Sequence, residues 1–98
     1  MKHATKLNGA RARKMLANGT RVIQVCNPIT FRDFSVKGAV NVPLRRINFM
    51  QTVEFVKTDP IIVVGEDETD VSSLQAAINY MTNYGYTKIF YVPSHESW

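Results

Sequence analysis

The amino-acid sequence predicts a single α/β domain: a central parallel sheet of about five strands flanked by helices. Residues Ile61–Val64 are four consecutive apolar residues, which is typical of a strand buried on both faces. Short apolar segments of this kind alternate along the chain with segments of helical periodicity, and strands that alternate with helices form parallel sheets. A chain of 98 residues suits one small core, so we assign residues 1–98 to one domain.

Capping residues mark where the predicted helices begin and end. The first helix follows Asn8 or Thr5 as its N-cap and ends before an Asn-Gly turn. A second, short helix begins at Asn27 and Pro28, because Asn caps helices well and Pro suits their first position. Apolar residues at 71, 74, 78 and 81 predict a helix that begins near Val71 or Ser72. The predicted helical segments cover residues 8–17, 28–34, 43–56 and 71–84, and the predicted strands cover 21–26, 39–42, 61–64 and 88–92.

Composition suggests the compartment. The single cysteine, Cys26, excludes an internal disulfide and is typical of a reducing compartment, so we expect a cytoplasmic location. No apolar run reaches the roughly 18 residues that a membrane-spanning helix needs. The basic N-terminus has no apolar stretch behind it, so neither a membrane span nor a secretory signal is expected.

Charge is divided unevenly along the chain. Residues 1–46 carry ten Lys or Arg and one acid, whereas residues 47–98 carry two Lys and seven acids. Three interpretations stay open: ordinary solvated surface, a basic N-terminal half that binds an acidic partner, and self-association through opposite charges. RNA-binding motifs, zinc-ligand spacings and stacked aromatics are absent from the sequence, so nucleic acid is not an expected partner. The oligomeric state is not predicted.

The loop after Ile61–Val64 is the most informative segment for function. In open α/β sheets, ligands bind in loops at the carboxyl ends of strands, and anion-binding loops present backbone N–H groups. This loop instead carries four carboxylates, at positions 66, 67, 68 and 70. It is a solvated loop in which Asp70 caps the next helix, a docking patch for a basic protein, or a divalent-metal site. The spacing lacks the pattern of a calcium loop, so we assign no metal and no cofactor.

The segment from Phe31 to Val42 resembles a motif of rhodanese-like domains. That motif has an aromatic residue, three residues, His, an aliphatic residue, Pro, Gly-Ala, two residues and an aliphatic residue. Ser35 stands at the position of the His and Lys37 at that of the Pro. The residues that fit are Phe31, Val36, Gly38, Ala39 and Val42.

The resemblance extends over nearly the whole chain. The family's Asp-Val-Arg strand end is represented by Gln24, Val25 and Cys26. The Gly-Tyr pair before the last strand and the closing Trp are also similar to the family pattern, but two family glycines near the end are replaced. The matching residues are Gly85, Tyr86 and Trp98, and the two glycines are replaced by Pro93 and Ser94.

The resemblance implies a site as well as a fold. Active members carry a catalytic cysteine at the start of the loop after the central strand, and this cysteine accepts a sulfane sulfur from thiosulfate or a similar donor. Gly65 stands at that position, and no shift of the alignment supplies a thiol. The resemblance therefore implies a catalytically inactive domain, a pseudoenzyme that acts in protein binding or regulation. The loop equivalent to the active site comprises Gly65, Glu66, Asp67, Glu68, Thr69, Asp70, Val71 and Ser72.

The alternative is a sulfurtransferase that uses Cys26 as a relocated thiol. Cys26 is expected at the carboxyl end of its strand, at the same sheet edge as the acidic loop. It is either a small buried thiol of the core or a displaced nucleophile or redox group. Enzymatic activity is therefore uncertain and not expected.

A few further residues carry weaker expectations. His3 and His95 are expected at the surface rather than as ligands. Arg45 and Arg46 either begin a solvated helix or hold an anion. Four tyrosines are expected to pack on the helix and sheet, with an interface stripe as the alternative: Tyr80, Tyr84, Tyr86 and Tyr91.

Overall fold

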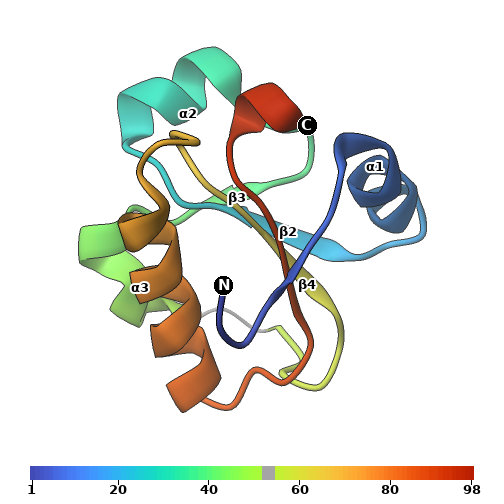
Figure 1. Cartoon of the computed structure of the whole chain (residues 1–98), viewed down its shortest axis with the longest axis vertical. Helices are drawn as coiled ribbons and strands as arrows, with labels where there is room; N and C mark the ends of the chain where they lie inside the picture. The colour runs from blue at the N-terminus through green and yellow to red at the C-terminus, as the bar shows by residue number, and fades with distance from the viewer. Residues whose placement is uncertain (52–54) are drawn as a thin grey trace.

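Five parallel strands form one sheet in the order β1-β5-β4-β2-β3 in the computed structural model, which describes residues 1–51 and 55–98, without the side chains of residues 49–51 (Figure 1). Every strand pairing is parallel, as the alternation of strands and helices predicts. The predicted α/β class and five-stranded sheet are confirmed. The strands are β1 (Thr5–Lys6), β2 (Arg21–Gln24), β3 (Val40–Asn41), β4 (Ile61–Val64) and β5 (Ile89–Val92).

The central strand β4 organises the core because all four of its residues are buried. Successive side chains of a strand point to opposite faces of the sheet. Ile61 and Val63 belong to one buried cluster, with α3 and the segment that precedes β4. Ile62 and Val64 belong to a second cluster, with α1. The helical elements are α1 (Gly9–Ala17), α2 (Pro28–Phe34), α3 (Val71–Asn83) and the 3₁₀ segments η1 (Leu44–Gln51) and η2 (His95–Ser97).

The N-terminal region holds the strand that the sequence did not predict. Thr5 pairs with Phe90 and Lys6 with Tyr91, so β1 forms one edge of the sheet. Thr5 therefore cannot cap α1, and Asn8 does so by accepting a hydrogen bond from the backbone N–H of Arg11 at 2.9 Å. The apolar pattern gave no signal for β1 because a two-residue Thr-Lys strand has no apolar residue.

The helical segments predicted at residues 43–56 and 71–84 differ in detail from the structure. Asp70 caps α3, and the predicted start at Val71 is confirmed. The assignment of Val71 to the apolar face is wrong, because this side chain is 52% exposed. The region from Pro43 contains the 3₁₀ segment η1, with a kink at Arg46, rather than a continuous helix. Residues 52–54 of that predicted helix lie outside the described residues. The buried side of α3 consists of Leu74, Ala77, Ile78 and Met81.

Gln24 is a fully buried polar residue at the end of β2. Its Nε2 donates a hydrogen bond to the carbonyl of Phe34 at 3.1 Å, and its Oε1 accepts one from the backbone N–H of Val36 at 2.9 Å. This amide therefore holds the connection between α2 and β3 against the sheet. The side chain at the family's Asp position has a structural role here.

Among the described residues, no helix has both the length and the apolar character needed to cross a bilayer.

Replacing Gln24 with Leu should lower the free energy of unfolding by about 1–3 kcal/mol, because the buried N–H of Val36 loses its acceptor. Urea denaturation followed by circular dichroism measures this loss. The control is Asn83→Leu, which adds a similar apolar side chain at an exposed position at the end of α3. Equal stability of Gln24→Leu and the control would contradict the structural role of Gln24.

Candidate functional site

The candidate site lies where the carboxyl ends of β2 and β4 meet. These strands are neighbours, with Gln24 opposite Val64, and the N–H of Val25 donates to the carbonyl of Val64 at 2.8 Å. Cys26 and Gly65 follow these two residues and so lie at the same sheet edge. The ends of both strands open into a pocket of about 520 Å³, whose polar lining includes Cys26, Asn27, Arg45, Glu66, Asp67 and Asp70.

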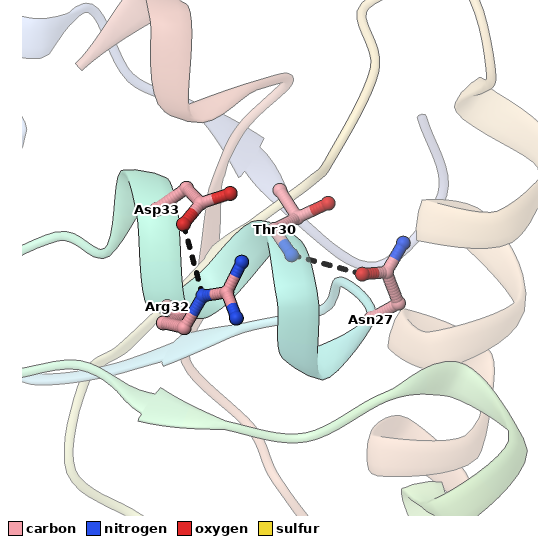
Figure 2. Close-up of polar contacts among 4 residues, drawn as sticks. All are labelled: Asn27, Thr30, Arg32 and Asp33. Carbon is pink, nitrogen blue, oxygen red and sulfur yellow. Dashed lines mark hydrogen bonds and ion pairs between the residues drawn. The ribbon is translucent and has the colours of Figure 1, made fainter.

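Glu66 joins the loop to the start of α2. Its carboxylate accepts hydrogen bonds from the backbone N–H of Asn27 at 3.0 Å, from Nδ2 of Asn27 at 3.1 Å and from the hydroxyl of Thr30 at 2.9 Å. The Oδ1 of Asn27 meanwhile accepts a bond from the N–H of Thr30 at 2.9 Å and caps α2 (Figure 2). In the same view, Arg32 pairs with Asp33 along the helix. Sequence patterns identified Asn27 as a cap but gave no sign of its contact with Glu66.

The other carboxylates of the loop accept hydrogen bonds from Thr and Ser residues. Asp67 accepts bonds from the backbone N–H and the hydroxyl of Thr69, and these bonds lower the pKa of Asp67 below its ordinary value. Asp70 accepts bonds from the Ser73 hydroxyl, the Ser72 hydroxyl and the Ser73 N–H, which lower its pKa in the same way. Glu68 accepts a hydrogen bond from the hydroxyl of Ser97. The carboxylates thus accept hydrogen bonds from backbone N–H groups that an anion-binding loop would direct at its ligand.

Every one of these hydrogen-bond donors is neutral. In the part of the chain that the structure describes, no Lys or Arg forms an ion pair with the carboxylates of Glu66–Asp70. Arg45 lines the same pocket without pairing with them, and it is exposed. The site therefore keeps a net negative charge, as the sequence predicted for this loop. Within the described residues, no group of three or more His, Cys, Asp or Glu is arranged to hold a metal ion.

Gly65 has no room for a side chain. A Cβ built on Gly65 would lie 2.3 Å from the carbonyl oxygen of Pro93 and 3.3 Å from Cδ2 of Leu74. The oxygen belongs to the backbone and is held in place by the continuation of the sheet, because the N–H of Gly65 donates to the carbonyl of Val92 at 2.9 Å. A cysteine at position 65 would therefore require the end of β5 to move.

Cys26 is buried, with 3% of its surface exposed. Burial, and secondly the negative charge of Glu66, raise the pKa of the thiol to about 11, while a hydrogen bond with Gln24 acts in the opposite direction. Nδ2 of Asn41 lies 3.5 Å from Sγ and donates to the carbonyl of Cys26 at 2.9 Å. Cys26 lines the candidate pocket, but its thiol is held in the protonated form at neutral pH.

The residues of the family-like motif support the turn into β3. Gly38 has φ of +82°, a left-handed conformation that favours glycine. Ser35 ends α2 and is exposed, while Phe31 and Ala39 are half-buried. None of these four lies among the lining residues of the pocket.

The remaining expectations have mixed outcomes. His3 is exposed, as expected, whereas His95 is half-buried and stacks on Phe34 with ring centroids 5.1 Å apart. The tyrosines pack as expected: Tyr86 is buried in the core, and Tyr80, Tyr84 and Tyr91 lie against it.

The comparisons with known proteins agree with this geometry. No family model matches the chain, and no curated protein matches it. Among solved structures, the chain is similar to a rhodanese with anions from E. coli (21% identity, TM-score 0.70, covering 82% of this chain and 92% of that one). It is also similar to a human single-domain sulfurtransferase (18% identity, TM-score 0.71, covering 100% and 96%). A rhodanese-like domain from Anabaena sp. gives 18% identity and a TM-score of 0.61, covering 88% and 81%. At these identities the likeness establishes the rhodanese-like fold that the sequence motifs predicted.

Gly65→Cys should lower the free energy of unfolding by about 1–3 kcal/mol, because the new Cβ meets the Pro93 carbonyl. Urea denaturation measures the loss, and Gly65→Ala should show most of it because the clash begins at Cβ. Pro93→Gly in the same chain should recover part of the loss by freeing the end of β5. A Gly65→Cys variant with the same free energy of unfolding as the unchanged protein would contradict the steric argument.

Alkylation of Cys26 by iodoacetamide should be negligible at pH 7 in the folded protein and should rise toward pH 11. Because the folded pKa lies above the ordinary value of 9.0, the folded state holds its proton more tightly than the unfolded state. Stability should therefore decrease as the pH rises from about 9 to about 11. Cys26→Ser is the control and should lack this part of the pH dependence. Rapid labelling at pH 7 without unfolding would contradict the shifted pKa.

Proposed function

We propose that this domain is a catalytically silent rhodanese-like module that acts by binding a basic protein partner through the acidic loop, residues Glu66–Asp70. The supporting observation is the arrangement at the end of β4. Gly65 occupies the place from which the family delivers its cysteine, and the Pro93 carbonyl fills the space that a side chain would need. We further propose that residues 1–98 form one domain and that it works in the cytoplasm.

Sulfur transfer of the rhodanese type requires a thiolate that attacks a sulfur donor. A ring of loop amides and a helix N-terminus normally lower the pKa of such a thiol. Here Asp67 and Asp70 accept the N–H groups of Thr69 and Ser73, and their negative charge opposes a neighbouring thiolate. The loop therefore disfavours both the nucleophile and its anionic substrate.

Protein binding suits the same features. The acidic loop presents carboxylates whose hydrogen-bond donors are neutral, so their charge remains available to an outside cation. The hydrogen bonds from Asn27 and Thr30 to Glu66 fix the loop's shape before a partner arrives. A pre-ordered charged surface loses little conformational entropy on binding and steers an oppositely charged partner toward it.

The second candidate function is sulfur transfer by Cys26. One observation favours it: the thiol lies at the same sheet edge as Gly65 and lines the same pocket. Its pKa of about 11 opposes it, because at pH 7 only about one molecule in 10⁴ carries the thiolate. The first candidate is therefore the better supported.

Purified protein incubated with thiosulfate and cyanide should form thiocyanate no faster than buffer, and Cys26→Ser should behave identically. An established rhodanese serves as the positive control for the assay. Turnover that exceeds background and vanishes in Cys26→Ser would instead establish the second candidate.

A fluorescent lysine- and arginine-rich peptide should bind the protein in low salt, and about 500 mM salt should weaken binding by tenfold or more, because salt screens exposed charges. Glu68→Gln together with Asp67→Asn should weaken binding at least about fivefold, since each removes a loop charge. Anisotropy titrations measure both effects. The control is Asp59→Asn, which removes one charge at an exposed position before β4, at the amino end of that strand. Equal weakening by the loop variants and the control would refute docking at the acidic loop.

A further inference from the structure

The short helix α2 contributes no residue to the hydrophobic core. None of its residues is buried, and among the described residues none belongs to either buried cluster or packs against one. Two of its large apolar side chains are mostly in solvent, since Ile29 is 65% exposed and Phe34 is 59% exposed. Burial of apolar surface is the dominant favourable term in folding. The helix α2 therefore lacks the attachment that holds α1 and α3 to the sheet.

A helix of this length is not stable by itself. It has seven residues, and isolated helices shorter than about 12–15 residues are marginal in water. Asn27 as N-cap and Pro28 at the first position determine where the helix begins. They do not supply the free energy that keeps it formed. The helix therefore depends on its contacts with the rest of the domain.

Within the described residues, the polar and ring contacts of α2 with other elements lie at its two ends. At the start, the carboxylate of Glu66 accepts hydrogen bonds from the N-cap residue and from the hydroxyl of Thr30. At the end, Nε2 of Gln24 donates to the carbonyl of Phe34, and the ring of Phe34 stacks on His95. Figure 1 shows α2 at the periphery of the molecule with η2, in red, beside it.

The chain on either side of α2 is fixed in the domain. Cys26 precedes the segment and is buried, and Val36 follows it and belongs to a buried cluster. The N–H of Val36 also donates to Oε1 of the fully buried Gln24 at 2.9 Å. Residues 27–35 therefore form a weakly packed segment between two anchored points.

We propose that residues 27–35 form a flap of the candidate site, in which α2 opens as a unit while the sheet stays folded and the carboxylate of Glu66 is the latch. Glu66 receives three hydrogen bonds at the start of the helix. Hydrogen bonds to an ionised acceptor are roughly twice as strong as those between neutral groups. The bond from Gln24 to the Phe34 carbonyl joins neutral groups. Release from Glu66 therefore removes the strongest attachment of the flap.

Opening of the flap changes the shape of the candidate site. Thr30 and Phe34 line a hollow of about 780 Å³ beside the acidic loop, and Asn27 lines the pocket of about 520 Å³. Glu66 lines both. An open flap removes one wall of each hollow and takes away the donors that fix Glu66. The closed fraction of the protein therefore determines how much of it presents the site in its described shape.

This inference concerns the motion of the protein without a partner. Its readout is amide hydrogen exchange, whereas the proposed function is tested by thiocyanate formation and by peptide anisotropy. A flap can open in a domain that binds no basic peptide, and a basic peptide can bind a domain whose α2 stays closed. The two proposals therefore fail independently.

Hydrogen exchange of the full chain, followed by NMR, measures the opening of the flap. The backbone amides of Asn27, Thr30 and Phe31 each have an acceptor that opening removes. They should share one protection factor, at least about 100-fold below that of the sheet amides of Val25 and Ile61, because sub-global opening costs less than unfolding. From zero to about 1 M urea the flap rates should change less than about twofold, since little surface becomes exposed. The sheet amides should exchange progressively faster.

A core variant separates flap opening from global unfolding. Ile78→Val removes a methylene from the buried face of α3, which stays packed when the flap opens. It should speed exchange of the sheet amides about threefold or more through its loss of global stability, and it should leave the flap amides unchanged. Equal acceleration of flap and sheet amides would show that α2 opens only when the whole domain unfolds, and would overturn the proposal.

Two variants test the latch. Glu66→Gln should speed exchange of the flap amides about tenfold or more, and Thr30→Val, which removes one donor, about threefold. The matched control is Asp33→Asn, which removes a carboxylate of α2 that pairs with Arg32 of the same helix. This control should change the flap rates less than about twofold, because surface ion pairs contribute little. Circular dichroism checks that all the variants fold.

The remaining outcomes also decide the matter. Unequal protection among the three flap amides would show fraying residue by residue, and unprotected flap amides would show that the closed state is not formed. Flap rates in Glu66→Gln that match those of the control would remove Glu66 as the latch. Each of these results would overturn the proposal.

Discussion

The contact between the Pro93 carbonyl and Gly65 constrains the whole candidate site. The N–H of Gly65 donates to Val92 at 2.9 Å, which extends the pairing of β4 and β5 by one residue beyond the strands. That extension brings the Pro93 oxygen to 2.3 Å from where a Cβ of residue 65 would stand. A backbone oxygen moves aside less readily than the end of a flexible side chain, so any side chain on the residue that begins the loop requires the end of β5 to shift. The first position of the loop therefore favours glycine over a residue with a nucleophilic side chain.

A loop without a thiolate is free to use its amides and charges differently. In this chain, the carboxylate of Asp70 accepts hydrogen bonds from the first turn of α3, and Oδ1 of Asp67 accepts hydrogen bonds from Thr69. Carboxylates near a helix N-terminus are favourable in themselves, because they meet the positive end of the helix dipole. The same charges beside a reacting thiolate would raise its pKa and repel an anionic donor. The stabilising contacts of this loop and the requirements of sulfur transfer are therefore in direct conflict.

The sequence was informative where one segment determines its own structure. The apolar run Ile61–Val64 predicted the central strand, and Asp70 predicted the start of α3. It failed where the outcome depends on distant segments: β1 forms because Thr5 and Lys6 reach β5, not because of any local pattern. The site divides in the same way. The missing thiol and the acidic loop are visible in the sequence, whereas the bonds from Asn27 and Thr30 to Glu66, and the Pro93 contact, arise only when strands far apart in the chain become neighbours.

Glu66 links the state of Cys26 to the integrity of the site. Its carboxylate holds the start of α2 through Asn27 and Thr30, and its charge is the second cause, after burial, of the raised thiol pKa. Removing that charge would remove one of the two effects that raise the pKa of the Cys26 thiol. It would also weaken the hydrogen bonds that hold the start of α2 to the loop. Burial, the larger effect, would remain, because it comes from the packing at the end of β2. Activating this thiol thus requires opening the same structure that places it at the site.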